Sequence, residues 1–145
     1  RERSMADVEL LMESDVTKEN LAALFRRAFF KTTFDSDGDL VVETDGPRVL
    51  VTIDEERRLL KYMAIYGVLE WSPLEEKLEL SNALNDKFIF ARFSIPEKRD
   101  DVLIADYFLP YEGGIPAFQI IAAVRLFSRV VPAAIRVCDE NNIVE

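Results

Sequence analysis

Three aspartates, Asp35, Asp37 and Asp39, alternate within residues 34–40, and carboxylates at this spacing could ligate Ca²⁺. An EF-hand loop needs glycine at its sixth position and a bidentate glutamate at its twelfth. Counted from Asp35, Gly38 is fourth and Gly46 is twelfth, so the sequence excludes an EF-hand. A looser carboxylate site stays open. Because Asp and Gly also supply the geometry of tight turns, we favour a solvated β-turn and assign no metal or other cofactor.

A fourth carboxylate, Asp106, interrupts an otherwise apolar segment. If that segment is a strand, alternation places Asp106 on a face that it shares with core residues. Its side chain would then be half-buried in its neutral form, or paired with a cation such as Arg92 on the neighbouring strand. We favour the ion pair. Asn82 and Asn85 could bind a ligand, although asparagine near a helix end more often bonds to the local backbone.

The composition limits other chemistry. The 145 residues include no histidine, which removes the commonest general base near neutral pH and the commonest metal ligand. The single cysteine, Cys138, cannot form an internal disulfide and has no histidine to activate it. The net charge of −9 argues against binding to a phosphate backbone, which needs clustered Lys and Arg. We therefore expect neither enzymatic activity nor nucleic-acid binding.

Apolar periodicity predicts three helices that would position these residues. The first spans residues 18–30 after Thr17, a good N-cap. The second opens on a capping box formed by Ser72 and Glu75, with proline at the first helical position, and ends at residue 85 or 86. The third begins near residue 116 and runs toward the end of the chain.

Short apolar segments between the helices predict an antiparallel sheet. Alternation and the Asp45-Gly46 turn indicate a four-stranded meander after the first helix, and a hairpin follows the second. The segment 59–66 is apolar on both faces, which is typical of a central strand. The predicted strands are 32–35, 40–44, 49–53 and 59–66 in the meander, and 88–95 and 102–109 in the hairpin.

The third helix carries more apolar surface than one core can use. One face, which includes Ile120, Val124 and Phe127, would by itself cover a sheet, and Pro132 should kink or restart the helix. The opposite half would expose an apolar stripe of a kind that soluble monomers usually avoid. We predict that this stripe contacts a second copy or a partner through Phe118, Ile121, Ala122, Arg125, Leu126 and Arg129. Trp71 is a further candidate for a surface contact.

Several segments in order resemble the YbjN-type family of bacterial sensory transduction regulators. They are residues 34–40 (FDSDGDL), 91–95 (ARFSI), 106–110 (DYFLP) and 112–114 (EGG), with Asn82, Leu84 and Asn85 closing the second helix. The likeness covers about residues 16–140. It implies a fold similar to that of type III secretion chaperones, with helices on one face of a curved antiparallel sheet, commonly assembled as a dimer. It implies no catalytic residues, since the family has none established.

We therefore predict one α+β domain over residues 16–145, in the order α-β-β-β-β-α-β-β-α, after an N-terminal arm or cloning remnant at residues 1–15. The expected function is that of a non-enzymatic, cytoplasmic protein-binding module, chaperone-like or a regulatory adaptor. It would act as a homodimer and bind another protein, without nucleic acid and without membrane insertion. A small-molecule or calcium sensor stays open, and an enzyme that works without histidine is the least favoured alternative.

Overall fold

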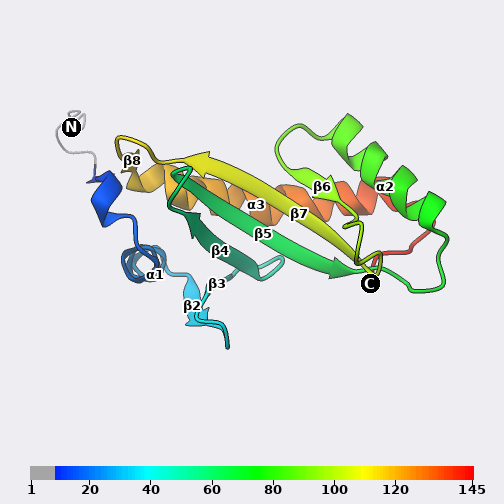
Figure 1. The fold of residues 1–145 in the computed structure, drawn as a ribbon, viewed down its shortest axis with the longest axis horizontal. Helices are drawn as coiled ribbons and strands as arrows, with labels where there is room; N and C mark the ends of the chain where they lie inside the picture. The colour runs from blue at the N-terminus through cyan, green and yellow to red at the C-terminus, as the bar shows by residue number, and fades with distance from the viewer. Residues whose placement is uncertain (1–8) are drawn as a thin grey trace.

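The computed structural model, which describes residues 9–145, has the α+β fold and the order of main elements that the sequence predicts. Its main sheet is antiparallel, with the strand order β2-β3-β4-β5-β7-β6. The long strands β5 and β7 pair along their whole lengths near the middle of this sheet (Figure 1). The strands are β2 (Lys31–Phe34), β3 (Leu40–Glu43), β4 (Val49–Asp54), β5 (Leu59–Gly67), β6 (Arg92–Ser94) and β7 (Val102–Pro110).

Helices cover one face of the sheet and leave the other face open. Figure 1 shows α3 running behind β5 and β7 along the length of the molecule. Side chains from alternate positions of the strands, such as Leu60, Tyr62 and Ala105, are buried in a single core with the apolar residues of the helices. The intervening side chains lie on the open face. The helices are α1 (Lys18–Arg27), α2 (Leu74–Lys87) and α3 (Ala117–Cys138).

The start of the described chain is tied to the start of α3. The short strand β1 (Leu10–Leu11) pairs antiparallel with β8 (Ile115–Pro116), and the 3₁₀ turn η2 (Glu13–Asp15) leads into α1. The backbone of Glu9 also accepts a hydrogen bond from Ala117 N. Part of the segment predicted as an arm therefore belongs to the fold, while residues 1–8 lie outside the described residues.

Tyr62 fastens α3 to the sheet. Its hydroxyl is fully buried and donates to the carbonyl of Ile120 at 2.9 Å, and its ring meets that of Phe127 edge-to-face at 6.4 Å. Burial raises the pKa of the Tyr62 phenol far above its ordinary value, and the Tyr107 phenol adds to the rise. The folded protein therefore holds this group neutral under conditions in which the unfolded chain would ionise it.

This shift predicts a loss of stability in alkali. Above about pH 10 the unfolded chain binds fewer protons than the folded chain at Tyr62, so the unfolding free energy falls as pH rises, by at most about 1.4 kcal/mol per pH unit. Below that pH this contribution is fully present. We expect urea unfolding from pH 8 to 11.5 to show a shallower alkaline decline for Tyr62→Phe than for the wild type. Equal slopes above pH 10 would contradict the assignment.

Two details of the predicted helices are wrong, and for the third helix one of the two predicted effects of Pro132, a restart, does not occur. α1 ends at Arg27 rather than residue 30, because Phe29 takes a left-handed backbone conformation (φ 71°) that stops the helix. The predicted capping box of α2 does not form: Pro73 is the N-cap, and the hydroxyl of Ser72 donates to Leu69 O instead. α3 continues through Pro132 as one helix and does not restart there.

One strand of the predicted sheet also differs in length. The first hairpin strand is shorter than 88–95, because only Arg92–Ser94 pairs with β7. The predicted turn at Asp45-Gly46 is present, but Gly46 has a reason other than turn geometry. A Cβ at Gly46 would lie 2.5 Å from the backbone oxygen of Ser128 in α3. Only glycine therefore allows the β3–β4 turn to approach α3 this closely.

Candidate interaction site

A groove of about 580 Å³ lies between α1 and the first half of α3. Its walls are mainly apolar and come from helices that are far apart in the sequence but share one face of the sheet. The apolar lining residues are Leu24 and Ala28 from α1, and Ala117, Phe118, Ile121 and Ala122 from α3. The remaining lining residues are Glu9, Arg27 and Arg125. A groove between two helices with this lining suits an apolar segment.

The charged residues of the groove are held in two different ways. Arg27 donates to the carboxylate of Glu9 at 2.7 Å, and this exposed ion pair bridges α1 and the segment before β1. Arg125 lies over the ring of Phe30, with its guanidinium carbon 5.5 Å from the ring centroid. No ion-pair partner of Arg125 is found within residues 9–145, so its cation faces the groove without a counter-charge.

An unusual aromatic residue follows α1. Phe29 is 97% exposed and has a φ of 71°, a conformation that costs about 1–2 kcal/mol for a residue with a side chain. The amides of Phe29 and Phe30 close the end of α1 by donating to Arg26 O and Phe25 O, both at 3.0 Å. Glycine normally fills such a position. An aromatic side chain held there in water is a candidate contact for another molecule.

The structure divides the stripe that we predicted on the third helix. Ile121 is buried and Leu126 is half-buried, so part of the stripe is covered within the same chain. Phe118 is 65% exposed, and Ala122, Arg125 and Arg129 are exposed as well. Four of the six predicted residues line the groove: Phe118, Ile121, Ala122 and Arg125. Because Leu24 and Ala28 of α1 form the opposite wall, the stripe becomes one side of a groove rather than a free helix face.

The predicted pair of Arg92 and Asp106 is present on the open face of the sheet. The two residues are direct partners across β6 and β7, and Arg92 Nε and Nη2 donate to Asp106 Oδ1 and Oδ2 at 2.9 and 2.8 Å. Asp106 is 3% exposed, whereas the side chain of Arg92 is 66% exposed. These bonds raise the pKa of Arg92 above its already high value, so the guanidinium stays charged. It neutralises a carboxylate that would otherwise be buried alone.

Neither predicted asparagine forms a hydrogen bond with Arg92 or Asp106 among the described residues. Asn85 Nδ2 donates to Phe93 O at 2.8 Å, and Phe93 N donates to Asn85 Oδ1 at 2.9 Å. Asn85 thus fastens α2 to β6, a longer-range backbone contact than the local one we expected. Asn82 is exposed on α2. A shallow pocket of about 360 Å³ beside the pair is lined by Asn85, Arg92, Asp106 and aromatic residues, two of which, Phe90 and Tyr107, stack at 4.4 Å.

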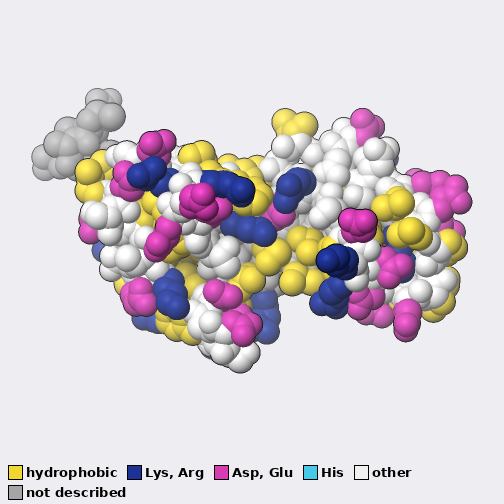
Figure 2. Space-filling model, in the orientation of Figure 1, with side chains coloured by type: hydrophobic (Ala, Val, Ile, Leu, Met, Phe, Trp, Pro, Cys, Tyr) yellow, Lys and Arg dark blue, Asp and Glu magenta, His cyan; other side chains and the backbone are white. Residues whose placement is uncertain are grey.

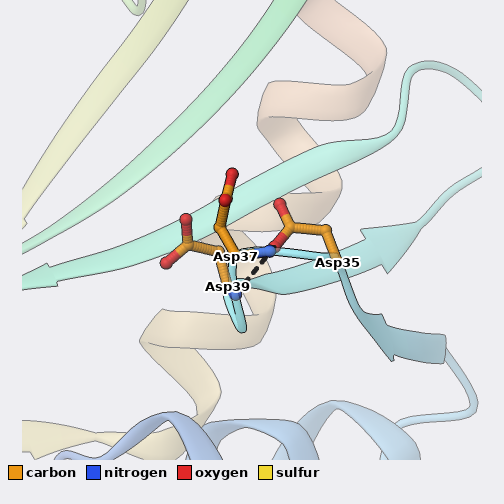
Figure 3. Close-up of side chains that lie close together, drawn as sticks. All are labelled: Asp35, Asp37 and Asp39. Atoms are coloured by element: carbon orange, nitrogen blue, oxygen red, sulfur yellow. Dashed lines mark hydrogen bonds between the residues drawn. The ribbon is translucent and has the colours of Figure 1, made fainter.

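The alternating aspartates form a turn, as Figure 3 shows. One oxygen of Asp35 accepts hydrogen bonds from the backbone amides of Asp37 and Asp39 at 3.0 and 2.9 Å. Gly38 takes φ 80°, and its carbonyl accepts from Lys18 Nζ at 2.9 Å, which brings a cation to the turn. Carboxylate oxygens of the three aspartates lie within 4.8 Å of one another. The bonding explains these residues as a turn without any ion.

The hydrogen bonds of this turn lead to two expected results. Asp35→Ala should lower the unfolding free energy by about 1 kcal/mol, because two backbone amides lose their acceptor. Millimolar Ca²⁺ should leave the melting temperature of the wild type unchanged, since an ion that binds only the folded state would raise it. Calorimetric melting of both proteins with Ca²⁺ and with EDTA measures both effects. A calcium-dependent rise that Asp35→Ala abolishes would establish a metal site instead.

Comparison with known proteins supplies the family. A model of the YbjN family, described as "putative bacterial sensory transduction regulator", matches residues 17–140. The chain belongs to the YbjN family. A crystal structure of YbjN from E. coli, titled "a putative transcription regulator", has a TM-score of 0.74 to this chain at 13% identity. The match covers 93% of this chain and 98% of that one, and shows that the two share a fold. No match was found among curated proteins.

Membership in the YbjN family agrees with the resemblance found in the sequence. The family description is that of a regulator and names no reaction or ligand. Within residues 9–145, none of the helices combines the length and the apolar character needed to cross a bilayer. The one cysteine of this YbjN chain, Cys138, is buried near the end of α3. The groove between α1 and α3, at about 580 Å³, is larger than the pocket of about 360 Å³ beside Arg92 and Asp106.

Proposed function

We propose that this YbjN-family chain is a non-catalytic regulatory module that binds an amphipathic helix of a partner protein in the α1–α3 groove. The observation that carries the proposal is the groove itself, which is apolar inside and has an exposed phenylalanine in its wall, Phe118. A helix that lays its apolar face into a groove needs no titrating group, which suits a chain without histidine. The cytoplasmic location stays a prediction from the sequence.

The charge of the groove favours a partner helix with acidic residues beside its apolar face. Arg125 contributes a cation that has no counter-charge among the described residues. Arg27 is paired only through an ion pair that is more than half exposed. A carboxylate from the partner would reach Arg125 with little desolvation cost, while the apolar contacts with Phe118 and Leu24 would supply most of the affinity.

Two alternatives from the sequence have less support. The pocket beside Arg92 and Asp106 is smaller than the groove, and Arg92 already uses two of its donors on Asp106, so a small-molecule sensor is less favoured. The homodimer predicted on α3 would compete for the surface that we give to the partner. Because Leu24 and Ala28 already wall this surface, we assign it to a helical segment and place the second copy elsewhere.

A displayed library of random peptides tests the proposal, because it samples many possible partner helices at once. Selection on the wild type, with counter-selection on Phe118→Asp, should enrich amphipathic helical sequences with acidic positions. Their affinity for Phe118→Asp should be at least about tenfold weaker than for the wild type, a difference of about 1.4 kcal/mol. The control Lys18→Glu also makes the net charge more negative, but outside the groove, and should leave peptide affinity unchanged. Peptides that bind all three proteins equally would refute the groove.

Phe29 offers a test in which stability and binding move in opposite directions. Phe29→Gly should raise the unfolding free energy by about 1 kcal/mol, because glycine adopts the left-handed conformation without strain. It should also weaken the binding of the selected peptides, since it removes an exposed aromatic ring that directly follows Ala28, a lining residue of the groove. Urea unfolding and titration calorimetry on the same preparation measure both quantities. Unchanged peptide affinity would remove Phe29 from the proposed binding surface.

A further inference from the structure

α2 buries a lysine and exposes two leucines. Lys77, on its inner side, is 2% exposed and lies 3.8 Å from Asp100, whereas Leu74 and Leu78 on its outer side are each about half exposed. Trp71, just before the helix, is 74% exposed. We call Trp71, Leu74 and Leu78, with the exposed Glu75 and Glu79, the α2 outer face. A helix that buries a lysine and exposes two leucines to water has an apolar face that no other part of residues 9–145 covers.

The open face of the sheet is also apolar, but its charge is opposite. Alternation along β4, β5 and β7 places Leu50, Met63 and Ile104 there, together with the exposed residues Ile65 and Phe108. Lys61 and Arg92 both lie over the ring of Phe108, at 5.7 and 5.5 Å from its centroid. We call Leu50, Lys61, Met63, Ile65, Arg92, Ile104 and Phe108 the open sheet face.

The charges on these two faces are complementary. Alternation also places three acids on the open face of the sheet. Asp106 is buried and bonded to Arg92, while Asp54 and Glu43 each lie 3.6 Å from a cation, Arg57 and Lys31 respectively. Lys61 has no ion-pair partner among residues 9–145. Figure 2 shows basic side chains around the yellow centre of the molecule, and acidic side chains gathered at the end that α2 occupies in Figure 1. A chain of net charge −9 thus carries a locally basic apolar face and a locally acidic apolar face.

We propose that a second copy of this chain covers the open sheet face with its α2 outer face, and that the two copies exchange this contact to form a closed dimer. Each copy supplies both surfaces, so one two-fold axis can satisfy both contacts at once and bury both apolar faces. The leucines of α2 would lie on Phe108 and Met63, and Glu75 and Glu79 would lie near Lys61. This interface is separate from the α1–α3 groove and leaves it free for a partner.

Charge reversal tests whether the open sheet face of each copy contacts the α2 outer face of the other. Lys61→Glu makes the open sheet face acidic, and the double variant Glu75→Lys/Glu79→Lys makes the α2 outer face basic. Alone, each variant should dimerise at least about tenfold more weakly than the wild type, because like charges face each other in both contacts. In an equimolar mixture, each heterodimer has one wild-type contact and one contact with both signs reversed. The mixture should therefore recover the dimer that both variants lack alone.

Light scattering after size exclusion, over a range of concentrations, reads out the mass. The wild type is expected at twice 16.6 kDa, and Leu78→Asp is expected to be monomeric. Lys18→Glu and Phe118→Asp, which change charge on α1 and in the groove, should leave the dimer intact. Circular dichroism and melting confirm that each variant is folded. A wild-type monomer, a dimer that survives Leu78→Asp, or a mixture that stays monomeric would each overturn the proposal. A dimer lost in Phe118→Asp would move the interface to α3.

Discussion

Replacing Phe127 by alanine is expected to lower the unfolding free energy by about 3–5 kcal/mol, the usual cost of removing a buried phenylalanine. Phe127 is fully buried on the inner side of α3 and packs against Tyr62 of β5. The loss of its ring would leave a cavity at the contact that holds the longest helix on the sheet. Urea unfolding and thermal melting of the purified variant measure the change.

Phe118→Ala is the matched control, because it removes the same ring from the opposite side of the same helix. Phe118 is 65% exposed, so its replacement should change stability by no more than about 0.5 kcal/mol. It should weaken the binding of the selected peptides instead. Similar stability losses in the two variants would contradict the division of α3 into a core face and a binding face.

Removing Arg92 is expected to cost about 2 kcal/mol, because it leaves the carboxylate of Asp106 buried without a counter-charge. We place the value below that of a fully buried pair, since the side chain of Arg92 is 66% exposed and water can enter once it is gone. Denaturant unfolding of Arg92→Ala measures the loss. Its direct effect on peptides selected for the α1–α3 groove should be small.

The pair of Arg99 and Asp101 is the control for burial. Its bonding pattern is the same, with Arg99 Nε and Nη2 donating to the two carboxylate oxygens at 3.2 and 3.1 Å, but the side chain of Asp101 is 51% exposed. Arg99→Ala should therefore leave stability nearly unchanged, because the pair is exposed to solvent. If the two arginine variants lost equal stability, burial of Asp106 would not explain the importance of its partner.

Local patterns in the sequence predict the fold well. Thr17 caps α1 by accepting from Asn20 N, and Arg92, the suggested partner of Asp106, lies opposite it across β6 and β7. These features depend on neighbours in the chain or on one strand pairing. The apolar periodicity of the sequence and the residue types at helix ends are therefore sufficient to recognise them. The predicted face of Asp106 is wrong: Ala105 and Leu109 face the core, so Asp106 lies on the open face of the sheet.

Features that depend on contacts between residues far apart in the sequence could not be predicted. The partial cover of the α3 stripe requires α1 to lie beside α3, and no periodicity in either helix states which helices are neighbours. α2 shows the limit most clearly, because it buries Lys77 and leaves Leu74 and Leu78 about half exposed, which the periodicity of the helix alone does not indicate. The exposed and strained Phe29 could have been suspected only from the absence of glycine where a helix had to end.

Chemical-shift mapping tests the proposed function most directly. A peptide from the displayed library would be titrated into the isotope-labelled wild-type chain, and the amide and methyl signals followed. We predict that the shifts concentrate on Leu24, Ala28, Phe118, Ile121 and Ala122, and that Phe118→Asp abolishes them at the same peptide concentration. Shifts centred on the open sheet face or on α2, with the groove residues unchanged, would contradict the assignment of the groove as the partner site.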